Sequence, residues 1–313
     1  MKVLVTGGAG FIGSHLCERL VDRAYGVVAA DNLILGRLPN LATLEGQSGF
    51  KFVEMDVAEE SAVDQLFAEQ QFGAVFHLAA NSDIARSHLE PHTDFRNTLC
   101  TTWSVLEAMR RHSVKKIVFA STSAIYGEVP GIIREDYGPL MPISHYGAAK
   151  LASEALISSF SENYGIQAWI ARFPNVVGDR ATHGAVRDFV RKLKQSPDRL
   201  EVLGDGSQEK PYIHVQDLID AMLLIWDKTN DRINLFNIGG STRCSVARIA
   251  EIVIEESGLY ARIDYTGGDR GWIGDVPSVD YDISRIRTLG WEPRLDSESA
   301  IRAAAQWMVK EVM

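Results

Sequence analysis

The chain has 313 residues, enough for one large domain or two unequal ones, and its 46% hydrophobic and 23% charged residues are typical of a globular protein. The formal net charge of -9, with no run of lysines and arginines, argues against a nucleic-acid-binding surface. The apolar stretches are no longer than strands, so we expect no membrane span. The N-terminal segment does not resemble a signal peptide, and Cys17, Cys100 and Cys244 form no CxxC pair. These features predict a cytoplasmic protein with reduced thiols.

Short β-branched runs alternate with helical patterns through the first half of the chain. The predicted strands cover 2–7, 26–32, 50–57, 74–80, 115–122 and 166–173. The predicted helices cover 11–24, 61–70, 101–112 and 145–164. Ser144 is a plausible N-cap of the last helix, and Gly165 follows its end.

This alternation predicts βαβ units and therefore an α/β fold with a doubly wound parallel sheet, the Rossmann arrangement. From about residue 175 the pattern changes to longer loops and scattered helices. We expect a Rossmann domain over 1–174 and a smaller C-terminal lobe over 175–313 that binds the substrate, with some of its segments returning to the Rossmann domain.

The first predicted strand ends in TGGAGFIG, which places Gly7, Gly10 and Gly13 between a strand and a helix. Glycines at such a turn let backbone N–H groups approach a phosphate, and the helix dipole attracts the same anion. The second strand ends in Asp31, an acidic residue suited to the ribose hydroxyls of NAD and unfavourable for the extra phosphate of NADP. Because no arginine follows until Arg37, the sequence favours NAD.

Tyr146 and Lys150 in SHYGAAK are four residues apart, a spacing that most often marks only one face of a helix. A dinucleotide site changes this interpretation, because the helix after the fifth strand would border the nicotinamide. A free phenol has a pKa of about 10, and a nearby cation lowers it. With Lys150 one turn away, Tyr146 is a candidate general base and, in reverse, general acid.

Taken together, these segments resemble the extended short-chain dehydrogenase/reductase family, which includes NAD-dependent nucleotide-sugar epimerases and dehydratases. The resemblance extends along the whole chain. It rests on TGGAGFIG, the DN at 31–32, HLAA at 77–80, Asn97, STSAIYG at 121–127, YGAAK at 146–150, RFPN at 172–175, YIHVQD at 212–217 and the WEP beginning at residue 291.

The resemblance implies roles for individual residues. The catalytic residues would be Thr122, Tyr146 and Lys150, with Thr122 bonded to the reacting sugar oxygen. The NAD-binding residues would be Gly7, Gly10, Phe11, Ile12, Gly13, Asp31, Asn32, Asp56, Val57, Leu78, Ala79, Ala80, Asn97, Ser121, Tyr146 and Lys150. The substrate-binding residues would be Thr122, Asn175, Lys210, Tyr212, Arg270 and Asp275. The resemblance also implies a homodimer.

Position 124 separates the reaction types of the family. Its dehydratases typically carry a glutamate there, whereas this chain has Ala124, so elimination is disfavoured. The chain therefore looks most like the UDP-glucose (galactose) 4-epimerases, which implies C4 epimerisation of a UDP-hexose through a 4-keto intermediate. Another epimerase, a 4-ketoreductase or a dehydratase acting on a GDP-, CDP- or dTDP-sugar is the alternative, and a non-catalytic NAD-binding protein is a further one.

His88 and His92 have the spacing of a metal-binding pair on a helix. Pro91 lies between them and would disturb that helix, and no third ligand is close in the sequence. We therefore expect no metal site.

Overall fold

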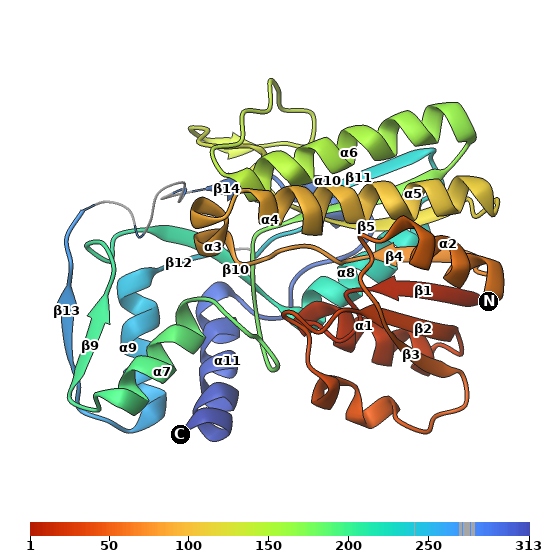
Figure 1. The fold of residues 1–313 in the computed structure, drawn as a ribbon. Coiled ribbons are helices and arrows are strands. Elements are labelled where there is room, and N and C mark those ends of the chain that lie inside the picture. Colours follow the sequence, from red (N-terminus) through yellow and green to blue (C-terminus); the bar gives the residue numbers. More distant parts are fainter. Residues whose placement is uncertain (241, 269–270, 272–275, 277–278) are drawn as a thin grey trace.

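The computed structural model describes residues 1–240, 242–268, 271, 276 and 279–313. Its centre is a seven-stranded parallel sheet in the order β11-β7-β5-β4-β1-β2-β3 (Figure 1). The strands are β1 (Lys2–Thr6), β2 (Gly26–Asp31), β3 (Phe50–Glu54), β4 (Ala74–His77), β5 (Lys116–Thr122), β7 (Gln167–Phe173) and β11 (Ile233–Asn237). The predicted α/β class and Rossmann arrangement are confirmed.

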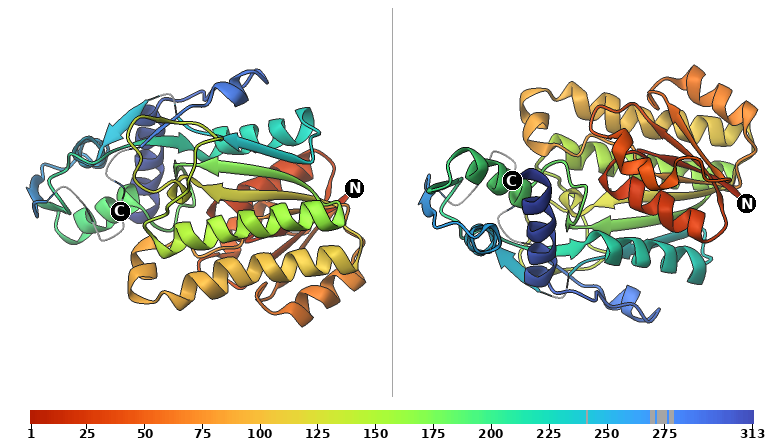
Figure 2. Two further views of the ribbon diagram at one scale, coloured as in Figure 1. Left: turned by 90° about the horizontal axis from the view of Figure 1, so that it is seen from above. Right: turned by 90° about the horizontal axis from the view of Figure 1, so that it is seen from below.

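Helices cover both faces of this sheet. On one face, α2 (Glu60–Glu69), α5 (Thr101–Arg111) and α6 (His145–Tyr164) lie side by side (Figures 1 and 2). On the other, α1 (Phe11–Asp22) packs with α8 (Val215–Lys228). Successive side chains of a strand point to opposite faces, so Val3 and Val5 enter one apolar core while Leu4 enters the other.

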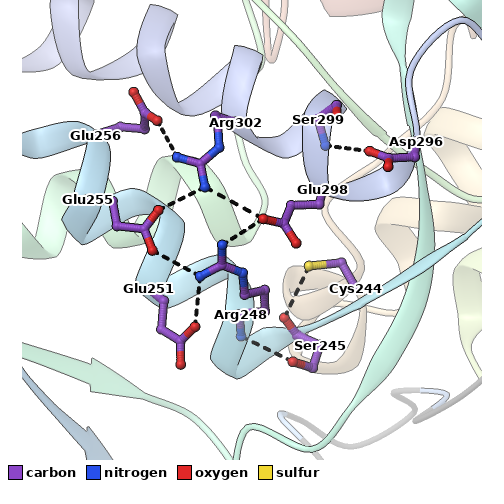
Figure 3. A network of polar contacts seen from close by, with 10 residues as sticks. All are labelled: Cys244, Ser245, Arg248, Glu251, Glu255, Glu256, Asp296, Glu298, Ser299 and Arg302. Carbon is purple, nitrogen blue, oxygen red and sulfur yellow. Dashed lines mark hydrogen bonds and ion pairs between the residues drawn. The ribbon is translucent and has the colours of Figure 1, made fainter.

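The remaining elements form a second body at the carboxyl ends of the strands (Figure 1). It contains α7 (Ala185–Gln195), α9 (Val246–Ser257) and α11 (Ser297–Val312), which share one apolar core with Tyr212. Its strands are β8 (Asn175–Val177), β9 (Arg199–Val202), β10 (Glu209–His214), β12 (Arg243–Ser245) and β13 (Arg262–Tyr265). An ion-pair network on its surface joins α9 to α11 (Figure 3).

Short elements complete the chain. They are η1 (Leu38–Leu44), α3 (Ile84–Leu89), α4 (His92–Asp94), the π-helical segment η2 (Phe95–Cys100), η3 (Ser123–Ile125), β6 (Ile132–Ile133), β14 (Asp280–Tyr281) and α10 (Ser284–Arg287). Within the described ranges, no helix has the length and apolar character to cross a membrane.

The sequence predicted six of the seven sheet strands and missed β11. This strand lies far along the chain, after α8, yet pairs in parallel with β7 from Ile233–Ala168 to Asn237–Arg172. The helix α8 also lies on the central sheet, although it belongs to the second half of the sequence. One strand and one helix from beyond residue 175 therefore belong to the central sheet and to the helices that cover it.

Candidate active site

A cavity of about 900 Å³ lies at the carboxyl ends of the sheet strands, between the sheet and the second body. This is where open α/β sheets bind ligands. Of the residues implied by the resemblance, those that line the cavity are Gly7, Gly10, Phe11, Ile12, Gly13, Asp31, Asn32, Asp56, Val57, Leu78, Ala79, Ala80, Asn97, Thr122, Tyr146, Lys150, Asn175, Lys210 and Tyr212. Residues far apart in the sequence are thus brought to one space.

The glycine-rich turn forms the floor of this cavity at the start of α1. A Cβ on Gly13 would lie 2.0 Å from the Gly7 carbonyl oxygen, so only glycine lets the helix approach the turn so closely. Gly7 has a φ of 69°, a conformation that also favours glycine. No side chain caps the N-terminus of α1, and no acidic residue lies in its first turn. Its first N–H groups are therefore suited to an anion.

Asp31 lies at the end of β2 and is only 6% exposed. Its carboxylate accepts a hydrogen bond from the Ala9 backbone N–H at 3.0 Å and one from Leu33 at 2.8 Å. Burial raises its pKa, and these backbone bonds lower it in part. Asp31 therefore ties the glycine-rich turn to the sheet, and it lines the cavity at the same time.

Two further predicted residues sit on the same wall with defined partners. Asp56 accepts from the Ala58 backbone N–H at 2.9 Å and pairs with Arg96 at 2.8 Å. Asn97 belongs to the π-helical segment η2, a geometry that often occurs at functional sites.

Thr122, at the end of β5, and Tyr146, in the first turn of α6, face the cavity together. Close packing at Gly147 brings them together, because a Cβ there would lie 2.5 Å from the Ala124 carbonyl oxygen. Ser144 caps α6 by accepting from the Gly147 N–H at 3.0 Å, as predicted. The Thr122 hydroxyl accepts from the Ala124 N–H at 3.2 Å, which leaves its own proton available to donate.

Lys150 is only 2% exposed, although it lines the cavity. Its ammonium donates to the Ala120 carbonyl at 2.7 Å and lies 4.7 Å from the centre of the Phe119 ring. Burial lowers its pKa to about 7, against the opposing effects of Glu154 and Asp94. Lys150 therefore changes protonation near neutral pH.

The structure differs from the sequence interpretation in the pKa of Tyr146. Burial raises that pKa to about 12, the negative charge of Asp94 adds to the rise, and a contact with the Thr122 hydroxyl lowers it. The sequence interpretation expected Lys150 to lower the pKa of Tyr146, but Lys150 is not among the groups that shift it. The sequence showed the cation one turn away, but not that Lys150 is buried and Tyr146 half-buried. This loss of contact with water disfavours the phenolate.

Ser121 lies behind the cavity, outside its lining. Its hydroxyl is fully buried and donates to the Glu154 carboxylate at 2.5 Å.

Two of the residues expected to contact the substrate, Arg270 and Asp275, lie outside the described residues.

The substrate side of the cavity is formed by the second body. Asn175 is exposed at the start of β8, and Lys210 and Tyr212 lie on β10, which pairs with β8. The Tyr212 backbone N–H donates to Ser297 at 3.0 Å, which fixes β10 against α11.

The sequence interpretation missed two buried polar residues near the site, of which Gln208 lines the cavity and Asp94 does not. Gln208 lines the cavity and is 3% exposed, and neither atom of its amide has a hydrogen-bond partner among the described residues. Asp94 is 1% exposed; its Oδ1 accepts from Asn81 at 3.0 Å, and its Oδ2 has no partner within the described ranges. The signal for Gln208 was weak, because it is one polar residue in a polar stretch just before β10.

Comparisons with known proteins agree with this geometry. Residues 3–239 match the NAD dependent epimerase/dehydratase family, and the chain belongs to that family. It is 31% identical to a putative UDP-glucose 4-epimerase of Methanocaldococcus jannaschii, over 98% of both chains. It is 32% identical to a probable UDP-arabinose 4-epimerase of Arabidopsis thaliana, over 97% of this chain and 80% of the relative. A crystal structure of UDP-galactose 4-epimerase is 34% identical and superposes with a TM-score of 0.89 over 100% of both chains.

Proposed function

We propose that the protein is an NAD-dependent nucleotide-sugar epimerase that inverts C4 of a UDP-sugar through a 4-keto intermediate. The observation that carries this proposal is one cavity bounded by an uncapped glycine-rich helix start, by Thr122 and Tyr146, and by a second body bearing Asn175. Relatives over nearly the full length of the chain bear the names of UDP-sugar 4-epimerases.

The residues present fit the cofactor. The uncapped N–H groups at the start of α1 suit its diphosphate, and Asp31, Asn32 and Lys150 line the same cavity. Asp31 and Asn32 would hold an adenosine ribose, and Lys150 would hold the end that reacts. Bound NAD would take up hydride from C4 and return it, and the positive charge of its oxidised ring would favour the Tyr146 phenolate.

Tyr146 and Thr122 handle the proton in this proposal. Thr122 donates a hydrogen bond to the sugar O4, and Tyr146 accepts the O4 proton as the carbonyl forms, then returns it on reduction. Protonated Lys150 favours the transient phenolate by its charge. The raised pKa of Tyr146 keeps the proton on the phenol between these steps, which suits the return of that proton to O4.

The cavity lining near Thr122 and Tyr146 favours epimerisation over dehydration. Ala124 lines the cavity and has no group that could accept or donate a proton, so loss of water from C5 and C6 would lack its acid–base partner. The 4-keto sugar is then reduced again, and inversion requires it to present its other face.

Gln208 supports a pyrimidine nucleotide as the substrate. Its buried amide offers one acceptor and two donors, and leaving such a group unpaired costs about 1–3 kcal/mol. A uracil imide edge carries a matching donor and acceptors. Gln208→Leu should therefore raise KM for the UDP-sugar more than it lowers kcat.

A homodimer is also part of the proposal. Phe95 and Trp103 are 54% and 40% exposed, and Tyr164 at the end of the neighbouring α6 is 42% exposed. This aromatic surface suits a second copy of the chain. Sedimentation should give a dimer, and Trp103→Glu should shift it toward the monomer.

A panel of UDP-, GDP-, CDP- and dTDP-sugars followed by NMR tests the proposed function. We expect the C4 epimer to appear from a UDP-sugar, whether hexose, pentose or uronic acid, with no net change in absorbance at 340 nm. Denatured protein should release NAD rather than NADP. Accumulation of NADH, or a 4-keto-6-deoxy product, would instead indicate the ketoreductase or dehydratase alternatives.

A further inference from the structure

A buried ion pair lies directly behind the acid–base pair, where α6 packs on β7. Arg172 Nε donates to Glu154 Oε1 at 3.0 Å, and Arg172 Nη2 donates to Glu154 Oε2 at 2.6 Å. Glu154 is 7% exposed and Arg172 5%. Apolar side chains of similar volume are often as stable as such a pair, because both charges lose their hydration. Stability alone therefore does not account for it.

The ion pair fixes the same face of α6 that carries Lys150. Glu154 is one helical turn beyond Lys150, so both side chains point toward the sheet. Lys150 donates to the carbonyl of Ala120, and Glu154 accepts from the hydroxyl of the next residue, Ser121, at 2.5 Å. Ala120 and Ser121, two successive residues of β5, are thus hydrogen-bonded to Lys150 and Glu154 on two successive turns of α6.

The outer end of Arg172 extends this attachment to further segments near the cavity. Its Nη1 donates to the Tyr126 hydroxyl at 2.9 Å and to the Glu135 carbonyl at 3.1 Å. The Tyr126 hydroxyl donates to Asn237 on β11 at 2.7 Å. One connected set of buried contacts therefore joins α6 to β5, β7, β11 and the segment that leads into the N-cap of α6.

We propose that the Glu154–Arg172 ion pair is a positioning element of the reaction, which holds the Lys150 turn of α6 against the ends of β5 and β7. This inference rests on the proposed function for its kinetic consequences. Neither residue lines the cavity, so both act through Lys150 and Tyr146.

The charge of Glu154 also supports a positioning role for the ion pair. Glu154 raises the pKa of Lys150 against burial, so its carboxylate helps to keep a proton on a lysine that needs a positive charge. His77 contributes no charge at neutral pH, because burial lowers its pKa to about 3. The titratable and charged groups around Lys150 are Tyr146 and Glu154 of α6, Asp94 of α4, His77 of β4 and Arg172 of β7.

The test compares two double variants, each of which removes an ion pair between α6 and a neighbouring segment. Glu154→Leu with Arg172→Met removes the buried pair, and Glu162→Leu with Arg232→Met removes a pair whose side chains are 65% and 60% exposed. We expect the first variant to fold and to lose roughly tenfold or more in kcat with KM nearly unchanged, because the reacting groups are displaced. The second variant should match the wild type.

A titration of Lys150 gives a second measure that does not depend on turnover. In protein labelled with ¹³Cε-lysine, Lys150 is identified by the signal lost in Lys150→Met. Its pKa should fall in the buried-pair variant and stay unchanged in the exposed-pair variant. If the wild type converts no nucleotide sugar, the proposed function fails, while this titration still decides whether the ion pair acts on Lys150.

Wild-type kcat together with wild-type Lys150 titration in the folded buried-pair variant would overturn the inference. Should that variant not fold, Arg172→Lys takes its place, because a lysine keeps the charge but cannot make the two parallel contacts. The inference then requires a lower kcat at unchanged KM, and wild-type kcat would contradict it.

Discussion

Two groups of arginines and glutamates join neighbouring elements of this molecule, and they differ mainly in their exposure to water. The side chains of Arg172 and Glu154 are 6% and 8% exposed. In the network between α9 and α11, the side chains of Arg248 and Arg302 are 32% and 33% exposed (Figure 3). The exposed network contains more ion pairs, whereas the buried group contains a single pair surrounded by uncharged partners.

The number of ion pairs is therefore a poor guide to their effect. Water and salt screen an exposed pair, which typically contributes about 0–1 kcal/mol. Removing one partner of a buried pair leaves an uncompensated charge and costs about 3–5 kcal/mol. The comparison indicates that the network in Figure 3 supports only the packing of α9 on α11, whereas the buried pair also affects the groups next to it.

The largest expected effect concerns the residue that the buried pair supports. Tyr146→Phe removes the proton acceptor and keeps the ring, so kcat should fall roughly 10²–10⁴-fold with folding intact. Steady-state kinetics and a thermal melt measure both properties. Near-native turnover would mean that Tyr146 is only part of a helix surface, and the proposed chemistry would lose its base.

The second effect is on stability. Arg172→Met alone should lower the free energy of unfolding by about 3–5 kcal/mol, because Glu154 is left buried without its partner. Urea denaturation measures this change. A loss below about 1 kcal/mol, the range of surface pairs, would remove the contrast between the two groups.

The third effect depends on pH and concerns Lys150. Its pKa is about 7 in the folded protein, compared with the ordinary value of 10.5. Between pH 7 and pH 10.5, the lysine is therefore protonated more fully in the unfolded chain than in the native one. The free energy of unfolding contributed by this group therefore rises with pH over that window. Compared with Lys150→Met, the wild type should gain stability between pH 7 and about 9.5. A constant difference across this range would contradict the burial argument.

A smaller effect is expected at Gly147. Replacing it with alanine places a Cβ 2.5 Å from the Ala124 carbonyl oxygen, so α6 must shift away from Thr122. A shift of a few tenths of an ångström should lower kcat on the order of tenfold. Ala148→Ser, on the exposed side of the same turn, is the control and should leave kcat unchanged.

The smallest effect belongs to the exposed network. Arg302→Met should change the free energy of unfolding by about 1 kcal/mol or less and leave kcat unchanged. The comparison between the two groups would be wrong if this variant lost activity to the same degree as the buried-pair variant.

The glycine-rich turn, Asp31 and the Tyr146–Lys150 pair could be predicted because each is a short pattern whose spacing reflects local chemistry. The strand β11 was missed, since it pairs with β7 across many intervening residues and nothing local marks it. Arg172 did carry a signal, the one charge in the mostly apolar run IQAWIARF, which indicates a buried partner. Its partner Glu154 could not be identified without the fold, and neither could the burial that raises the pKa of Tyr146.

Incubation with a UDP-sugar in deuterated water tests C4 epimerisation most directly. In the proposed reaction, the hydrogen on C4 is removed and returned to the same carbon within the cavity, and Ala124, which lines the cavity, provides no group for elimination. We therefore predict that the C4 epimer forms with no solvent deuterium on any carbon. Deuterium at C3, C5 or C6 would show enolisation or elimination, and the account of a simple C4 epimerase would be contradicted.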